Sequence, residues 1–248
     1  MVLRICRLAA LLLAFSPVLV AARADLNPEY GDPTYRANTV FSPDAASPAE
    51  YKQRVIVVFH GFMSAVPNGT FKRLYRKFRR DYTVIGINYN PLEVERTLGL
   101  LNDVALRHLQ GRQVTVIGTS LGGFWARYFG KLTRAHRVVM LNPLVRPQRQ
   151  LQKYAGRTRQ NVRRARKYVI RQTDLADYAR FDVRRFDGPP TLLIVTLDDD
   201  FVDPNIAIRT YRGSVNMTIE AYDSGGHTIK LQRHNALQRI AEFLVAPS

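Results

Sequence analysis

One serine in this sequence has the surroundings of a reactive nucleophile. Ser120 is the middle residue of GTSLG (118–122), which fits the pattern G-x-S-x-G. In this motif a strand turns directly into a helix, and the turn exposes the serine hydroxyl while the two glycines permit a close approach of the backbone. The alternative is a serine that caps a glycine-rich turn of the nucleotide-binding type. Because neither G-x-G-x-x-G nor a Walker G-K-[ST] is present, we predict that Ser120 is a nucleophile.

A serine nucleophile needs a general base, and His227 is the best-placed histidine. In the hydrolases that use this motif, the acid and then the histidine follow the serine along the chain. His227 lies in DSGGHT, directly after a predicted strand at 215–222, where two glycines allow the loop to fold back. We expect His234 to lie inside the last helix, and we expect structural roles for it and for His108 and His136.

The carboxylate that orients the histidine should follow the preceding strand. The segment TLDDDFVD, which follows a predicted strand at 190–197, offers Asp198, Asp199, Asp200 and Asp203. One of them would accept the hydrogen bond of the histidine ring and stabilise the imidazolium. Asp203 is better suited to cap a helix that starts at a proline. The residues themselves do not separate Asp199 from Asp200, and a turn or a cation site is the alternative role of this cluster.

Two backbone N–H groups should stabilise the oxyanion that forms when an ester carbonyl is attacked. We predict the N–H of Leu121, which directly follows the nucleophile, as the first donor. The second should come from the loop HGFM, which follows a predicted strand at 54–61. Phe62 is the candidate there, with Met63 second. We expect His60 to shape this loop rather than to transfer protons.

The elements that must position these residues alternate regularly along the chain. Short, continuous β-branched runs predict strands buried on both faces, and stretches with helical spacing lie between them. The expected strands are 54–61, 82–89, 113–118, 137–143, 190–197 and 215–222, and the expected helices are 70–80, 91–111, 121–132, 204–212 and 230–245. This alternation predicts a three-layer α/β fold with a mostly parallel sheet of about six strands and helices on both faces.

The N-terminal segment differs from the rest of the chain. Residues 1–24 combine early arginines, an apolar run and the sequence ARA, a pattern typical of a cleaved secretory signal. Residues 25–50 are rich in Pro, Ala, Asp and Ser and predict an extended arm before one domain at 51–248. The single cysteine, Cys6, lies within the signal. We therefore expect an exported protein, periplasmic or secreted, without disulfides or a cysteine-based metal site.

A basic segment interrupts the alternation at about 146–187, where we expect a partly helical cap inserted over the carboxyl edge of the sheet. Between Arg146 and Arg171 there are ten Lys or Arg residues and no Asp or Glu, in a chain whose formal net charge is +17. Such a field attracts anionic substrates or an anionic envelope surface. A solvated face without a dedicated ligand is the alternative. The export signal argues against a nucleic-acid partner.

Several of these segments together resemble a known family. The segments are VVFHGF, VIGTSLGGFWARYFG, VVMLNPLVRP, DDDFVD and GGHTIKLQRHNALQRIAEFL. They are similar, over about residues 54–245, to the small bacterial YqiA/YcfP-like esterases of the α/β-hydrolase superfamily. In that group a D-E-V-L-D stretch carries the triad acid at its first position, which falls on Asp199 here. The residue before it is Asp198 instead of the usual glycine or asparagine, so Asp200 remains the alternative.

The resemblance implies a serine esterase that acts on short acyl chains without a cofactor or metal. In this interpretation Ser120, His227 and Asp199 form the triad, and a small-molecule ester is the substrate. The other interpretation is a binding protein on a hydrolase scaffold that holds an anionic polymer or membrane surface with its basic cap. Fold alone does not decide between them, because one fold hosts many functions.

Overall fold

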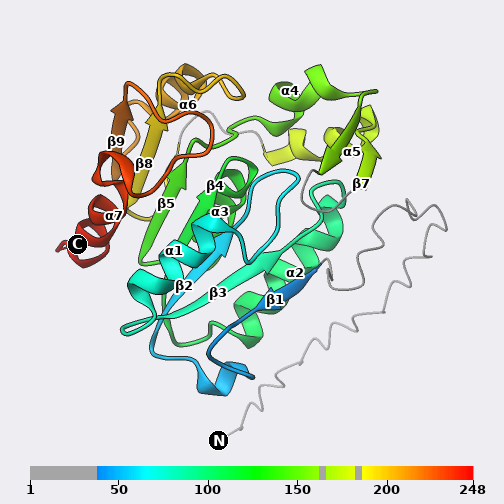
Figure 1. Cartoon of the computed structure of the whole chain (residues 1–248). Helices are drawn as coiled ribbons and strands as arrows, with labels where there is room; N and C mark the ends of the chain where they lie inside the picture. Colours follow the sequence, from blue (N-terminus) through cyan, green and yellow to red (C-terminus); the bar gives the residue numbers. More distant parts are fainter. Residues whose placement is uncertain (1–37, 162–165, 182–185, 248) are drawn as a thin grey trace, which may run out of the picture.

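A mixed seven-stranded sheet forms the centre of the molecule (Figure 1). The computed structural model describes residues 38–161, 166–181 and 186–247. The sheet has the order β1-β3-β2-β4-β5-β8-β9. Its strands are β1 (Thr39–Phe41), β2 (Arg54–Phe59), β3 (Thr83–Asn88), β4 (Gln113–Thr119), β5 (Arg137–Leu141), β8 (Thr191–Thr196) and β9 (Met217–Tyr222). All neighbouring strands are parallel except β1, which pairs antiparallel with β3.

The predicted count of six strands is wrong by one. All six expected strands are present, and β1 is the seventh, formed by residues that we expected to belong to an extended arm. It pairs Thr39 with Asn88 and Phe41 with Gly86 at one edge of the sheet. A three-residue strand of this kind has no periodic pattern to reveal it, because its stability comes from its distant partner strand.

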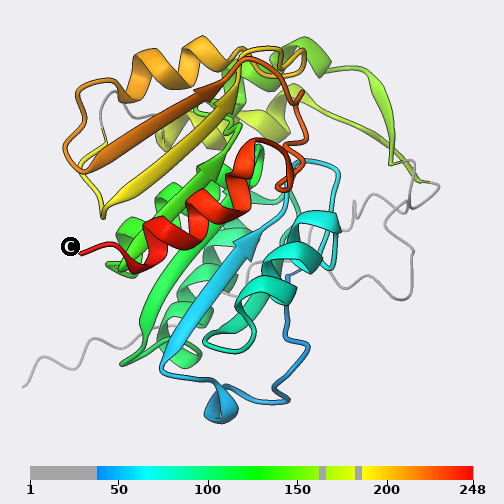
Figure 2. The same cartoon turned by 60° about the vertical axis from the view of Figure 1, so that its left-hand side comes forward.

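Helices cover both faces of the sheet. The helices are α1 (Gly69–Phe78), α2 (Val94–Arg107), α3 (Leu121–Leu132), α6 (Pro204–Tyr211) and α7 (Ala236–Val245). Buried residues of α1 and α7 belong to one apolar cluster, and buried residues of α2, α3 and α6 belong to the other. Figure 2 shows α1 and α7 together on the near face of the sheet. The three-layer arrangement therefore agrees with the prediction.

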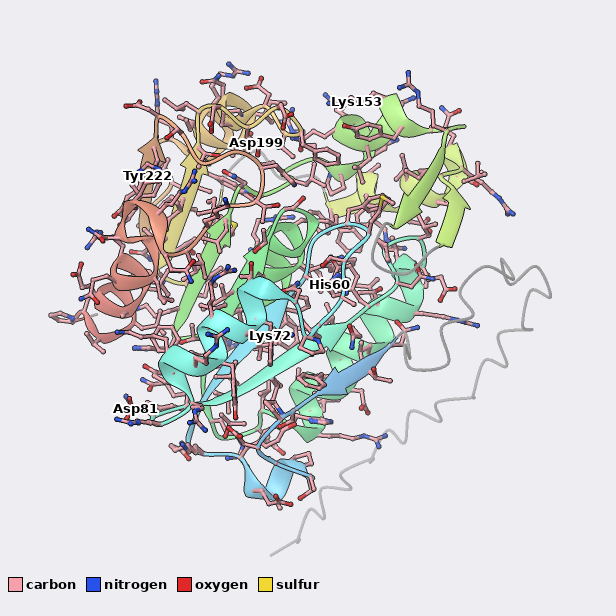
Figure 3. All side chains as sticks on the ribbon, in the orientation of Figure 1. His60, Lys72, Asp81, Lys153, Asp199 and Tyr222 are labelled. Atoms are coloured by element: carbon pink, nitrogen blue, oxygen red, sulfur yellow. The ribbon has the colours of Figure 1, made fainter. Side chains whose placement is uncertain are left out.

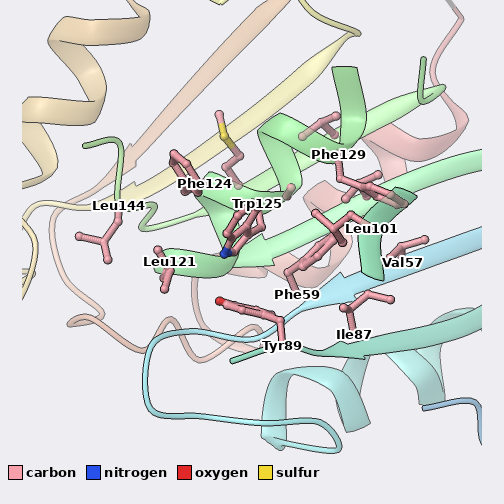
Figure 4. Close-up of a cluster of buried hydrophobic side chains, with 14 of the residues drawn as sticks. Val57, Phe59, Ile87, Tyr89, Leu101, Leu121, Phe124, Trp125, Phe129 and Leu144 are labelled. Carbon is pink, nitrogen blue, oxygen red and sulfur yellow. The ribbon is translucent and has the colours of Figure 1, made fainter. Parts of the chain in front are cut away.

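The larger of the two apolar clusters surrounds the start of α3. Trp125 is fully buried there, with the rings of Tyr89 and Phe124 in edge-to-face contact at centroid distances of 6.0 and 5.1 Å. Phe59 packs against Phe129 on the same side (Figure 4). Large buried rings dominate the energetics of such a core, so the helix that follows Ser120 has a rigid support.

The basic insertion follows β5 and lies at the end of the sheet toward which the strand arrows point in Figure 1. We call this segment, 146–187, the cap. It contains α4 (Pro147–Leu151), a 3₁₀ turn (Gln152–Tyr154), the hairpin β6 (Thr158–Asn161) and β7 (Arg166–Val169), α5 (Gln172–Ala176) and a second 3₁₀ turn (Asp177–Phe181). The hairpin is a feature that the sequence analysis did not predict.

Buried contacts of Tyr178 and Arg127 help to hold the cap against the main domain. The Tyr178 hydroxyl donates to the Pro91 carbonyl at 2.8 Å, and the Tyr178 ring lies edge-on to Phe124 at 5.3 Å. Arg127 of α3 donates to the carbonyl of Phe181 at 2.9 Å. Because Tyr178 and Arg127 are buried, these bonds form away from water, and the cap is part of the same core.

The last helix begins later than predicted. Residues 230–235 are not part of α7, and a 3₁₀ turn (Arg233–Asn235) precedes it. His234 and Asn235 have positive φ angles of 55° and 56°, which end any helix running through them. His234 therefore lies outside the helix, with its ring stacked on Tyr222 at 4.8 Å.

The predicted signal at 1–24 and residues 25–37 of the predicted arm lie outside the described residues. Within the described part of the chain, no helix combines the length and apolar character needed to cross a bilayer.

Candidate active site

Ser120 lies on a sharp turn between β4 and α3. Its backbone has φ 56° and ψ −123°, in the positive-φ region that most residues avoid. The turn also brings neighbouring backbone very close. A Cβ atom on Gly118 would lie 1.9 Å from the Gly122 carbonyl oxygen, and one on Gly122 would lie 2.4 Å from the Phe59 carbonyl oxygen. Both motif positions therefore require glycine for steric reasons, as the predicted turn demands.

Backbone hydrogen bonds anchor this turn to the adjacent strand. The Ser120 N–H donates to the carbonyl of Leu141 at 2.9 Å, and the Ser120 carbonyl accepts from Gly123 at 2.8 Å and from Leu144 at 3.0 Å. These bonds tie the turn to β5 and to the chain that leaves it. The strained backbone of Ser120 is thus held by its surroundings, as is typical of functional turns.

The structure brings Ser120, His227 and Asp199 together. Ser120 Oγ lies 3.0 Å from His227 Nε2, and His227 Nδ1 lies 2.8 Å from Asp199 Oδ2. Since a carboxylate only accepts hydrogen bonds, Nδ1 carries the ring proton, and Nε2 of the neutral ring is free to accept the serine proton. The Asp199 side chain is 1% exposed and that of His227 is 23% exposed, so the acid is buried and the base reaches solvent.

The two candidate acids occupy different environments. Asp199 Oδ1 accepts the N–H groups of Phe201 and Val202, each at 2.9 Å, which fixes the carboxylate beside the histidine. Asp200 is exposed on the same turn. Asp203 caps α6 by accepting the Asn205 N–H, as predicted from the proline that follows it.

The loop that carries His227 is held by Asn142 and Thr196, which the sequence analysis did not assign to the site, and by Asp198, one of the four carboxylates that it offered as the acid. Asn142 Nδ2 donates to the carbonyls of Gly226 and His227 at 3.0 and 3.1 Å, and the Thr196 hydroxyl donates to the Gly226 carbonyl at 2.8 Å. Asp198 accepts the N–H groups of Gly225 and Gly226, and these bonds lower the pKa of its carboxyl.

Asn142 carried one usable signal in the sequence. It follows the strand next to the nucleophile strand, at the same edge of the sheet, where side chains meet in α/β folds. Its φ of 41° also suits asparagine better than most residues. The amide is buried, and its oxygen accepts the Thr196 N–H at 2.8 Å. It thereby joins the ends of β5 and β8 to the histidine loop.

The loop after β2 borders the serine. A Cβ atom on Gly61 would lie 3.3 Å from Ser120 Cβ, so the loop that contains Phe62 passes close to Ser120. Leu121 is the first residue of α3. Both predicted oxyanion donors therefore belong to segments that adjoin Ser120.

The other histidines have neighbours of their own. His60 is buried, its ring is stacked on Tyr89 at 4.3 Å and its Nδ1 lies 2.8 Å from the Gly61 carbonyl, which fits a role in shaping the loop (Figure 3). His108 contacts the Tyr51 hydroxyl at 3.4 Å. Partial burial lowers the pKa of His108 and of His136. His60 and His108 therefore contact groups outside the Ser120–His227 pair.

The Phe201 ring lies between the cap and His227. The Phe201 ring lies 4.6 Å from the His227 ring, and Tyr154 of the cap stacks on Phe201 at 5.2 Å. Lys153 of the cap donates to the Phe201 carbonyl at 3.2 Å. Figure 3 labels Lys153 and Asp199 at the same end of the molecule. The described residues contain no group of three His, Cys, Asp or Glu side chains that could hold a metal ion.

Comparison with known families identifies the relatives of this chain. Residues 55–245 match the model of the uncharacterised protein family UPF0227. The chain belongs to this family. The match covers the sheet except β1 and the first residue of β2, and it includes the Ser120 turn and the His227 loop, so the predicted resemblance is confirmed. No curated protein sequence matches the chain.

Solved structures show the fold of this UPF0227 protein. Mouse alpha/beta hydrolase domain-containing protein 10 superposes with a TM-score of 0.61 at 14% identity, covering 79% of this chain and 91% of its own. Est1E of Butyrivibrio proteoclasticus, with ferulic acid bound, has a TM-score of 0.61 at 12% identity, with coverages of 84% and 93%. The monoacylglycerol lipase of Paleococcus ferrophilus has a TM-score of 0.58 at 14% identity, with coverages of 77% and 93%. The predicted α/β-hydrolase fold is thereby confirmed.

Proposed function

We propose that this UPF0227 protein is a serine hydrolase that cleaves carboxylic esters. The observation that carries the proposal is the continuous chain from Ser120 Oγ through the His227 ring to the buried Asp199 carboxylate, with contacts of 3.0 and 2.8 Å. The esterases and lipases among its structural neighbours support the same reaction class. Small esters with short acyl chains are the proposed substrates, and export to the periplasm or beyond is the proposed location.

The reaction proceeds in two halves. His227 Nε2 takes the proton of Ser120 as Oγ attacks the ester carbonyl, and Asp199 stabilises the imidazolium that forms. The N–H groups of Leu121 and Phe62 donate to the oxyanion of the tetrahedral intermediate. Protonated His227 then gives its proton to the leaving alcohol, which leaves an acyl-Ser120 ester. Water, activated by the same histidine, releases the acid and restores the serine.

Purified protein with p-nitrophenyl acetate and butyrate, beside a fluorophosphonate probe, tests this proposal. We expect turnover and covalent labelling of the wild type, and a loss in kcat of at least about 10³-fold with no labelling for Ser120→Ala. Ser214→Ala is the matched control, because Ser214 is also buried but its hydroxyl bonds the Phe186 N–H. A wild type that neither turns over these esters nor is labelled would overturn the proposal.

A second candidate function is suggested by the charge of the cap. A binding protein on this scaffold would hold an anionic polymer or surface through the basic residues of Arg146–Arg171. Steeply salt-dependent binding that Ser120→Ala leaves intact, together with no ester turnover by the wild type, favours this function over catalysis.

A further inference from the structure

The charged residues that line a cavity between α4 and α6 are all basic. It measures about 570 Å³, and its described lining residues are Arg146, Arg149, Gln150, Ile206, Arg209 and Thr210. We call it the arginine pocket. Its volume lies within the range of small-molecule sites, which are typically a few hundred to a thousand Å³. The described hydrogen bonds and ion pairs join none of these six side chains to Ser120, Asp199 or His227, so the pocket is a feature separate from the proposed triad.

Two buried donors in this lining have no acceptor among the described residues. Gln150 Oε1 accepts the N–H groups of Val145 and Arg146, both at 2.8 Å, which determines the orientation of its amide. Gln150 Nε2 is therefore a donor, and it is buried without a hydrogen-bond partner in the described structure. Arg146 Nε is also buried without a hydrogen-bond partner in the described structure. Buried donors are nearly always satisfied in folded proteins, and an acceptor that enters between α4 and α6 would satisfy these two atoms.

The charges around the pocket specify what kind of acceptor this is. Three guanidinium groups border it, and none of its lining residues is acidic. Arg209 has one ion pair, with Asp203 at 3.8 Å, and both side chains are largely exposed, so this pair competes weakly for the guanidinium. Guanidinium groups present planar pairs of donors that match the oxygens of phosphates and carboxylates. An acceptor with several anionic oxygens therefore fits better than a neutral one.

We propose that the arginine pocket binds a phosphate group. Arg146, Arg149 and Arg209 supply the charge, and the Gln150 amide supplies a neutral donor. Ile206 gives one wall apolar character, and the volume leaves room for an organic group attached to the phosphate. The ligand is either a soluble phosphate ester or the headgroup of a phospholipid. The site binds this group whether or not Ser120 is catalytic.

A single isosteric substitution tests the donor argument. Gln150→Glu keeps the oxygen that accepts the Val145 and Arg146 N–H groups, but it replaces the free donor with an anionic oxygen. We expect it to weaken binding of inorganic phosphate and glycerol 3-phosphate by about tenfold or more, measured by titration calorimetry at constant ionic strength. Gln152→Glu is the matched control, because Gln152 is exposed on the same segment and the change in net charge is equal.

A second pair of variants separates the pocket from the general positive field. Arg149→Gln/Arg209→Gln removes two charges from the lining, and Arg76→Gln/Lys77→Gln removes two exposed charges of α1, on the other face of the sheet. We expect the first double variant to lose phosphate binding and the second to retain it within about twofold, since distant exposed charges are screened. Unfolding temperatures of all four proteins show whether each variant is folded.

The same proteins distinguish the two sources of phosphate. Saturable binding of glycerol 3-phosphate without binding to phosphatidylglycerol vesicles identifies a soluble ester, and pocket-dependent binding to these vesicles but not to phosphatidylcholine vesicles identifies a headgroup. Ser120→Ala should bind like the wild type, which separates this proposal from the catalytic one. Absence of saturable binding to every probe overturns the proposal, as does equal weakening in the pocket variant and its matched control.

Discussion

The Ser120 turn and the cap lie at the same end of the sheet, yet they are built in opposite ways. Around Ser120 the position of each polar group is set by buried hydrogen bonds between the ends of parallel strands, as for Asn142, Thr196 and Asp199. Among the described side chains of the cap, most charged groups lie at the surface, as Arg149 does. We call the first region the catalytic edge.

This difference indicates a division of labour between the two regions. Reaction geometry tolerates little displacement, and buried hydrogen bonds in a low-dielectric setting hold atoms more firmly than exposed charges do. Long-range attraction needs no fixed geometry, so exposed arginines suffice for it. We therefore expect substitutions at the catalytic edge to change the rate of the chemical step, and substitutions in the cap to change which ligands the protein attracts.

The largest effect should come from the acid of the catalytic edge. Asp199→Asn replaces the carboxylate with a neutral amide that neither stabilises the imidazolium nor enforces the tautomer, and we expect kcat for p-nitrophenyl acetate to fall by about 10⁴-fold. Asp200→Asn is the control, because Asp200 is exposed beside it, and its kcat should be unchanged. An active Asp199→Asn with an inactive Asp200→Asn would reverse the assignment.

A smaller effect should follow from loosening the histidine loop. Thr196→Val removes the hydroxyl that donates to Gly226, and we expect kcat to fall by about tenfold with KM nearly constant, because the loop then positions His227 less well. Thr191→Val is the matched control at the opposite end of β8, where a buried hydroxyl donates to Pro189. Equal losses of kcat in both variants would mean that stability, not positioning, is responsible.

We expect the charge of the cap to make kcat/KM for anionic esters depend on the salt concentration. For an ester with an anionic alcohol group, we expect kcat/KM to fall about two- to tenfold when NaCl is raised from about 50 to 500 mM, because exposed charges are screened. A neutral ester of similar size should show almost no change. If raised salt changes kcat/KM equally for both esters, the cap does not select substrates by charge. The functional difference that we infer between the cap and the catalytic edge would then be wrong.

The smallest effect concerns acid stability at the catalytic edge. Backbone N–H groups of Gly226 and Gly225 lower the pKa of Asp198 below its ordinary value of 3.8. Its stabilising effect is therefore fully present above that value and is lost as the pH falls through the lower pKa of the folded state. We expect Asp198→Asn to lower Tm slightly at pH 7 and the difference from wild type to close toward pH 3. A Tm difference between Asp198→Asn and the wild type that stays constant from pH 7 to pH 3 would contradict this expectation.

Most of the fold could be predicted because the hydrophobic pattern of each main strand and helix is a local property of the sequence. Six strands and the helices between them lie within a few residues of their expected ranges, since continuous β-branched runs occur only where both faces of a strand are buried. The strand β1 and the hairpin β6–β7 were missed because strands of three or four residues depend on their partner strands for stability. The start of α7 was wrong because positive φ angles at His234 and Asn235 leave no sequence pattern.

The candidate site shows the same limit. The motif spacing predicted Ser120 and His227, because a turn between strand and helix imposes glycines around the serine. The choice between Asp199 and Asp200 depends on which side chain faces into a turn, a three-dimensional property that adjacent identical residues conceal. Asn142 was missed because its role consists of bonds to a loop 84 and 85 positions away along the chain.

The burial of Trp125 gives this protein a built-in optical probe. It is the only tryptophan in the sequence, so the intrinsic tryptophan emission of the molecule comes from one site. Trp125 lies five residues after Ser120. Its indole ring packs against Tyr89, which directly follows β3, and against Tyr178 of the cap. A red shift of the Trp125 emission therefore reports that water has reached α3. This is expected when the cap separates from the main domain and also when the whole domain unfolds. Comparing emission with far-ultraviolet circular dichroism during heating separates these two events in a single unlabelled sample.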